Sequence, residues 1–209
     1  MISNDYTRMA KDTNRLREPI IKSVIKELQL PTGSHGLDAG CGIGFQAMML
    51  AEEIGPAGHV TGLDLSAESL DYAKGIVDQA GLSEMVSFQE GDVNQLPFDD
   101  VLFDWAWSMD CVGYAPIEPL PLLQELARVV KHGGMIAISA WSSEVLLPGY
   151  PLLEAHLDAT SVGIAPFNKG MKPESHFTRA LGWFREAGLV ECSARTFAGD
   201  VYAPLSEVQ

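Results

Sequence analysis

Three closely spaced glycines give this sequence its first candidate for chemistry. Gly40, Gly42 and Gly44 follow directly after the short apolar run 36–39. Glycine lacks a Cβ, so a ligand can approach its backbone closely, and the first amides of a following helix can donate hydrogen bonds to that ligand. A turn that uses glycine for its conformation alone is the alternative. The neighbouring segments must decide between the two.

A carboxylate further along the chain favours the ligand interpretation. Asp64 lies at the end of the next apolar run, 59–65. An acidic residue there can accept hydrogen bonds from both hydroxyls of a ribose, although Asp64 alone would more often be a solvated carboxylate. The dinucleotide fingerprint requires a third glycine where this chain has Phe45. The pair of features therefore predicts a nucleoside-containing cofactor other than a dinucleotide.

The elements that must position these groups alternate between strands and helices. Apolar runs predict strands over 36–39, 59–65, 86–89, 103–109, 135–141 and 189–197. Helical spacing and end signals predict helices over 15–30, 45–54, 66–80, 119–131 and 174–187, and a turn at 132–134 before the fifth strand. Such alternation implies a mostly parallel sheet with helices on both faces. The sequence predicts a Rossmann-like, doubly wound α/β fold.

The chain length indicates one domain. With 209 residues, two domains would each have an undersized core, and no repeat or linker divides the chain. We therefore expect a single domain over 1–209, with a helical arm over 1–34. The segment 142–172 is rich in Pro and Gly and follows the end of a strand, so we expect it to shape a substrate pocket.

Composition and charge restrict the partners. The net charge is −14, and no block of Lys or Arg is present, which disfavours nucleic acid and favours a small neutral, cationic or apolar molecule. Cys41, Cys111 and Cys192 have no Cys-x-x-Cys spacing, so we expect reduced thiols and no metal site. The N-terminus lacks a signal-peptide pattern and no apolar run is long enough to span a bilayer, which predicts a cytoplasmic protein.

A family resemblance extends this interpretation. Residues 37–44, Leu-Asp-Ala-Gly-Cys-Gly-Ile-Gly, resemble the first motif of class I S-adenosylmethionine-dependent methyltransferases, especially the small-molecule group similar to quinone-biosynthesis enzymes. Further segments resemble later motifs of that family, in order: 62–66, 91–93 with 96–98, and 126–134. The resemblance implies S-adenosylmethionine as cofactor and methyl transfer to an oxygen, nitrogen or carbon of a small organic acceptor.

The resemblance also implies roles for individual residues. Asp38 and the backbone of the glycine turn would face the methionine end of the cofactor, and Asp64 would hold the ribose. Asp92 would accept a hydrogen bond from the adenine amino group, although a turn-stabilising role for this side chain stays open. The complete expected cofactor-binding set is Asp38, Gly40, Cys41, Gly42, Gly44, Asp64, Leu65, Asp92, Val93, Trp107 and Ser108.

The reaction itself asks for little general catalysis. Methyl transfer is an in-line displacement, so positioning the acceptor supplies much of the rate, and a base is needed only if the acceptor must lose a proton. At the end of the fourth predicted strand, the residues expected to line the floor of the site are Trp107, Ser108, Met109 and Asp110. The candidates for a general base are Asp110, Tyr114 and His176, with Tyr6 as a possible lid residue. For each of these four, packing or solvation is the alternative.

Two other functions stay open from the sequence. A nicotinamide-dependent oxidoreductase would share the glycine turn and Asp64, but Phe45 counts against it. A non-catalytic cofactor sensor or partner-activating subunit would keep the fold and lack an acceptor pocket. Metalloprotease, phosphate-loop and Gly-x-Ser-x-Gly hydrolase motifs are missing from the sequence.

The end of the chain carries one further expectation. The resembled family usually inserts a seventh, antiparallel strand between the fifth and sixth, but residues 198–209 have little alternating pattern. We expect the seventh strand to be missing, either because the chain is truncated or because the domain is shorter.

Overall fold

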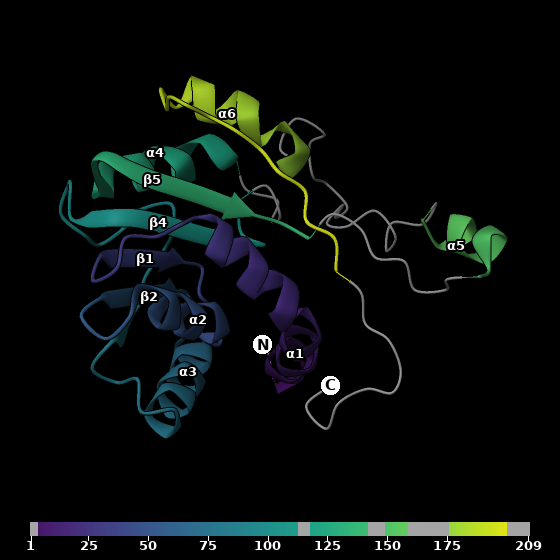
Figure 1. The fold of residues 1–209 in the computed structure, drawn as a ribbon, viewed down its shortest axis with the longest axis horizontal. Helices are drawn as coiled ribbons and strands as arrows, with labels where there is room; N and C mark the ends of the chain where they lie inside the picture. The colour runs from purple at the N-terminus through teal and green to yellow at the C-terminus, as the bar shows by residue number, and fades with distance from the viewer. Residues whose placement is uncertain (1–3, 113–117, 142–148, 159–175, 200–209) are drawn as a thin grey trace.

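The computed structural model describes residues 4–112, 118–141, 149–158 and 176–199. Helices and strands alternate along most of this chain (Figure 1), in the order α1 (Asn4–Glu27), β1 (His35–Ala39), α2 (Phe45–Ile54), β2 (His59–Asp64), α3 (Ala67–Gln79), β3 (Val86–Glu90), β4 (Phe103–Met109), α4 (Pro119–Val129), β5 (Val130–Ser139), α5 (Pro151–Asp158), η2 (Phe177–Arg179) and α6 (Ala180–Glu186).

The strands form one parallel sheet in the order β3-β2-β1-β4-β5. The core residues place α1, α2 and α3 against one face and α4 with α6 against the other (Figure 1). The predicted doubly wound α/β fold is therefore confirmed. The strand order reverses between β1 and β4, and this reversal is the switch point of the sheet. Ligands of such sheets bind at the switch point, outside the carboxyl ends of the strands.

Two tryptophans of β4 dominate the core on the α1–α3 face. Trp105 and Trp107 are both about 1% exposed, and Trp105 donates from Nε1 to Ser34 Oγ at 2.8 Å. The Trp105 ring lies over the backbone of Gly36, where a Cβ would come within 2.1 Å of ring carbon. Glycine at this position in β1 is therefore a packing requirement, which lets a large aromatic side chain cross the neighbouring strand.

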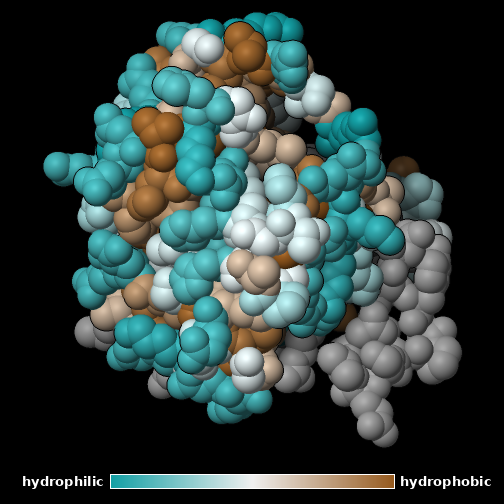
Figure 2. Space-filling view, turned by 60° about the vertical axis from the view of Figure 1, so that its left-hand side comes forward, coloured by the Kyte–Doolittle hydropathy of each residue, from teal (hydrophilic) through white to brown (hydrophobic). Residues whose placement is uncertain are grey.

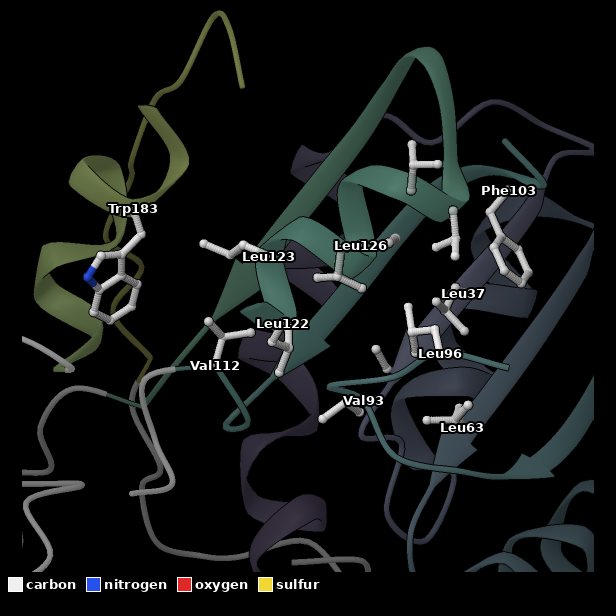
Figure 3. Close-up of a cluster of buried hydrophobic side chains, with 14 residues drawn as sticks. Leu37, Leu63, Val93, Leu96, Phe103, Val112, Leu122, Leu123, Leu126 and Trp183 are labelled. Carbon is white, nitrogen blue, oxygen red and sulfur yellow. The ribbon is translucent and has the colours of Figure 1, made fainter. Parts of the chain in front are cut away.

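The core on the opposite face joins α4 and α6 to the sheet (Figure 3). Leu122, Leu123 and Leu126 of α4 are almost completely buried. Trp183 from α6 belongs to the same cluster as Val112, which follows β4. Burial of a large aromatic side chain explains how a helix of only seven residues stays docked.

The first helix is longer than the sequence predicted. The predicted range was 15–30, but α1 runs from Asn4 to Glu27 and contains Pro19. The helix α1 ends at Glu27 because Gln29 adopts a left-handed conformation, with φ of 52°. Ile21 and Ile25 anchor α1 in the core against α2.

The fifth strand begins earlier than predicted. Residues 132–134 were expected to form a turn before a strand at 135, yet β5 starts at Val130. Val130 pairs with Phe103 and Met135 pairs with Trp105, so the expected turn is an irregularity inside the paired strand. Gly133 has φ of 80°, a conformation that glycine adopts without steric cost.

The predicted sixth strand over 189–197 is wrong. These residues form no strand, Glu191 among them has a left-handed φ of 55°, and Val190 is 84% exposed. The segment crosses to α1, where Arg195 forms an ion pair with Glu27 and Gly199 lies against Ile20. Arg195 and Gly199 make these contacts, whereas the apolar side chains Val190 and Phe197 are exposed. Within the described ranges, β5 is the last strand of the sheet.

Other predictions are tested only in part. The helix predicted over 174–187 is split into η2 and α6 within the described residues. Of the segment 142–172, the structure describes only residues 149–158, which include α5. The role of the segment 142–172 at a substrate pocket therefore stays a prediction. Residues 200–209, which bear on the seventh strand, also lie outside the described ranges.

Polar side chains surround separate apolar patches on the face that Figure 2 shows. Among the helices of the described residues, none combines the length and apolar character that crossing a membrane would require.

Candidate functional site

The glycine turn after β1 is built from left-handed residues. Gly40, Gly42 and Gly44 have φ values of 80°, 53° and 81°, which side-chain-bearing residues rarely adopt. At Gly44 a Cβ would also lie 2.8 Å from the Cβ of Ala73 and 2.9 Å from the Phe88 ring. Conformation and close packing therefore both require glycine, beyond any need to approach a ligand.

The same turn is fixed to the end of β2. The amides of Gly40 and Cys41 both donate to the carbonyl of Leu63, at 2.8 and 3.0 Å. The helix α2 follows with Gly44 as its N-cap, and this glycine has no side chain to accept a hydrogen bond from the first amides. The positive end of this helix thus lacks a capping side chain beside the switch point of the sheet.

The carboxylate of Asp64 is held in a fixed orientation. Its Oδ2 accepts from the Gly42 amide at 2.8 Å and its Oδ1 accepts from the Ser66 amide at 2.9 Å. Ser66 itself caps α3 by accepting from the Ser69 amide. Because a carboxylate oxygen can accept more than one hydrogen bond, both oxygens keep capacity for ligand hydroxyls. This geometry fits a ribose whose two hydroxyls each meet one oxygen.

A second carboxylate lies deeper, at the end of β1. Asp38 is 2% exposed, and its Oδ2 has no hydrogen-bond partner among the described residues. Burial, reinforced by the negative charge of Asp64, raises the pKa of Asp38 to about 8. Asp38 pairs in register with Trp107 of β4, whose buried Nε1 also lacks a partner within the described part. A ligand with a cationic group fits the orphaned oxygen of Asp38.

The residues after β3 form a turn. Asp92 is exposed, and its Oδ1 accepts from both the backbone and the side-chain nitrogen of Asn94, at 2.8 and 2.9 Å. The turn-stabilising role left open for Asp92 is thus observed, and its role toward adenine stays a prediction. Val93 is buried, whereas Leu65 after Asp64 is 66% exposed. Both stay predictions as cofactor contacts.

Arg128 of α4 clamps the chain that follows this turn. Its guanidinium donates to the carbonyls of Leu96 and Phe98 and to the carboxylate of Glu125, all at 2.7–2.9 Å. Glu125 in turn accepts from the Leu96 amide at 2.8 Å. The sequence placed Arg128 in a family-like segment without a role. The structure shows that it connects α4 with the loop after β3.

The end of β4 lies beneath the glycine turn. Ser108 is fully buried and donates from Oγ to the carbonyl of Ala39 at 2.7 Å, which joins the ends of β1 and β4. Cys111 lies under Gly40, where a Cβ would meet its Sγ at 3.0 Å. Trp107 and Ser108 therefore support the site from below, and direct contact with a cofactor stays a prediction for both.

A cluster on the other side of the switch point involves residues far apart in sequence. Asp110 has φ of 52° and accepts from the Trp141 amide at 2.8 Å. Arg17 of α1 lies 3.7 Å from Asp110 Oδ2, and its guanidinium lies 4.4 Å from the centre of the Trp141 ring. Asp110 thus holds α1 to the ends of β4 and β5, and its role as a base stays a prediction.

A second pair extends this contact. Gln46 of α2 donates from Nε2 to Asn14 of α1 at 3.1 Å and lies 3.7 Å from the sulfur of Met109. Sequence reasoning missed Arg17, Trp141, Asn14 and Gln46, because no local motif marks them. Only the packing of α1 brings them to the carboxyl ends of the strands.

The remaining catalytic candidates are not brought into this cluster by any contact of the described residues. His176 caps η2, where its Nδ1 contacts the hydroxyl of Thr178 at 2.9 Å. Tyr114 lies outside the described residues, and the side chain of Tyr6 is likewise not described. Their catalytic and lid roles stay predictions.

Comparison with known proteins agrees with this geometry. Residues 37–134 match a family described as a methyltransferase domain. A demethylmenaquinone methyltransferase of Staphylococcus aureus is 33% identical over 199 residues, which cover 87% of this chain and 78% of that protein. The chain belongs to the class I S-adenosylmethionine-dependent methyltransferases. The resemblance stated from the motifs is thus confirmed.

Two further matches set the extent of the similarity. A demethylmenaquinone methyltransferase of Listeria welshimeri is 35% identical over 150 residues, 71% of this chain and 62% of that protein. The chain thus spans somewhat less than two thirds of this relative. A solved S-adenosylmethionine-dependent methyltransferase from Aquifex aeolicus shares 26% identity with a TM-score of 0.67, over 89% of this chain and 88% of that one. The fold of this family thus extends over most of the chain.

Proposed function

We propose that this protein binds S-adenosylmethionine at the carboxyl ends of β1, β2 and β4 and transfers its methyl group to a small organic acceptor. One observation carries the proposal. Asp64 is oriented by the Gly42 and Ser66 amides, directly beside a left-handed glycine turn. This arrangement suits a nucleoside and lacks the third glycine of a dinucleotide site.

The residues of the site fit the two ends of that cofactor. Asp64 would accept the ribose hydroxyls, and Asp38 would face the ammonium of the methionine end. When bound, the cofactor supplies an activated methyl group on a sulfonium sulfur. Two carboxylates near a cationic ligand are favourable, whereas an anionic pyrophosphate beside them is not. Family membership and the relatives offer no support for the oxidoreductase or the non-catalytic alternative.

The acceptor side would be formed where α1 meets β4 and β5. Arg17, Asp110 and Trp141 connect these elements, and Met109 adds an apolar side chain. Positioning of an acceptor atom in line with the sulfur would supply the rate, with Asp110 as the candidate base if a proton must leave. Because the relatives are named demethylmenaquinone methyltransferases, an electron-rich aromatic acceptor is the first class to test.

A panel of metabolites with isotope-labelled methyl donor tests this proposal. We expect one class of small acceptor to gain the labelled methyl group, as read by mass spectrometry, and aromatic acceptors to lead. Titration with S-adenosylhomocysteine and with NAD is the companion measurement, and only the first should bind. Tight binding without transfer to any member would support a sensor, and preference for NAD would contradict the proposal.

The compartment follows as a smaller proposal. Cys41, Cys111 and Cys192 are all free thiols, which supports a reducing environment such as the cytoplasm.

A further inference from the structure

Asp38 is a buried titratable group whose protonation state in the free protein the proposed function does not specify. Asp38 is 2% exposed and sits at the end of β1, below the glycine turn. Its Oδ2 makes no hydrogen bond within the described residues. An ionised carboxylate that is buried without a partner is costly, so a group in this position either stays neutral or awaits a cation.

The neighbours of Asp38 favour the neutral form. Asp64 on the adjacent strand is the charged group that acts on it among the described residues, and that charge is also negative. The other titratable neighbours are the thiols of Cys41 and Cys111. Burial raises the pKa of both thiols, that of Cys111 to about 11, so they stay uncharged. Within the described part, Asp38 thus faces one carboxylate, two neutral thiols and the Trp107 ring.

We propose that Asp38 carries a proton in the free protein and releases it when the ammonium group of the cofactor binds. The inference rests on the function proposed above. The O–H bond of Asp38 breaks, the proton passes to the buffer, and the carboxylate then pairs with the ammonium. The two oxygens of Asp64 already accept backbone hydrogen bonds, whereas Oδ2 of Asp38 has no partner among the described residues.

The direction of the pH dependence follows from this exchange. Below a pKa of about 8 the free protein must give up the proton before the charge pair forms. Cofactor affinity should therefore rise with pH below 8, by up to about tenfold per pH unit. Measurements belong between pH 6 and 7, where Asp38 is mostly protonated in the free protein and the amino group of the ligand is an ammonium ion.

Calorimetry in buffers of different ionisation enthalpy counts the protons. Titration of the native protein with S-adenosylhomocysteine at pH 7 should release about 0.9 proton per site, the protonated fraction of a group with a pKa of about 8. S-Methyl-5′-thioadenosine has the nucleoside but no ammonium, and its binding should release less than about 0.1 proton. The affinity for S-adenosylhomocysteine should be several-fold to tenfold higher at pH 7 than at pH 6.

Two variants complete the test. Asp38→Asn keeps the shape of the neutral acid, so it should bind without proton release and with a flat affinity between pH 6 and 7. Asp71→Asn removes an exposed carboxylate of α3 and should release protons like the native protein. Binding of S-adenosylhomocysteine by the native protein with no proton release would overturn this inference alone. No binding at all at pH 7 would overturn the proposed function and this inference with it.

Discussion

The two sides of the switch point are assembled from partners at very different sequence separations. On the β1–β2–β3 side, Asp92 bonds to Asn94 and Asp64 bonds to Ser66, each two residues away, and Asp64 also reaches Gly42. On the β4–β5 side, Asp110 accepts from Trp141, 31 residues away, and pairs with Arg17 near the start of the chain.

This difference separates two kinds of function. The proposed cofactor side uses short segments whose backbone amides and carboxylates lie close in sequence. The proposed acceptor side depends on where α1 packs. We therefore expect changes on one side to alter cofactor affinity and changes on the other to alter acceptor turnover, and the following predictions test that separation.

Replacement of Asp64 should give the largest effect. Asp64→Ala removes the proposed acceptor of the ribose hydroxyls and leaves the Gly42 amide without its partner. Loss of charge-assisted hydrogen bonds at about 1.5–3 kcal/mol predicts affinity for S-adenosylhomocysteine roughly ten- to over a hundredfold weaker. Calorimetric titration measures the change, with Asp71→Ala as the control. Unchanged affinity would remove Asp64 from the site.

Loss of the Arg128 clamp should lower stability next. Arg128→Met leaves the carbonyls of Leu96 and Phe98 without their donor and Glu125 without its main partner. We expect a loss of about 2 kcal/mol, or a melting temperature lower by about 4–8 °C. Lys131→Met removes an exposed cation and should have a smaller effect. Equal shifts for both variants would contradict the importance of the clamp.

Replacement of Arg17 should affect only the acceptor side. Arg17→Leu removes the contact with Asp110 and the stacking on Trp141, which together are worth about 1 kcal/mol in a partly exposed setting. Acceptor kcat/KM should fall about fivefold while cofactor affinity stays within about twofold. Lys22→Leu, on an exposed part of the same helix, is the matched control. A parallel loss of cofactor affinity would break the separation of the two sides.

The amino ends of the strands provide a reference region with the smallest effect. Burial, the neighbouring His59 and Lys131 lower the pKa of His35 below 6.5, despite an opposing influence of Asp104. The folded state therefore resists protonation, so stability is full above pH 6.5 and falls as the pH drops through that value. His35→Gln should reduce this acid sensitivity by less than about 1 kcal/mol in chemical denaturation at pH 5 and 7.

Cofactor affinity should not change in that variant. A shift in affinity would mean that the two ends of the sheet are coupled, and the pH dependence assigned to Asp38 would then need the His35→Gln background as its reference.

Errors of prediction fall where distant contacts decide the structure. The apolar residues of 189–197 have the composition of a strand, but Arg195 and Gly199 contact α1, and no strand forms. The expected turn at 132–134 became part of β5 because Val130 pairs with Phe103. Local composition indicates a strand in the first segment and a turn in the second, but it does not say which partner the chain finds.

The sequence by itself determined the alternating strands and helices, the glycine turn and the position of Asp64, because each depends on local periodicity or on backbone conformations that few residues adopt. Tertiary structure alone decided that Arg17 meets Asp110 and Trp141. It also decided that Asp38 is buried beside a second carboxylate, with its Oδ2 unpartnered in the part of the chain that the structure describes. Burial and charge proximity are properties of the packed chain. The same Asp in an exposed strand end would ionise at its ordinary pKa and have no proton to release.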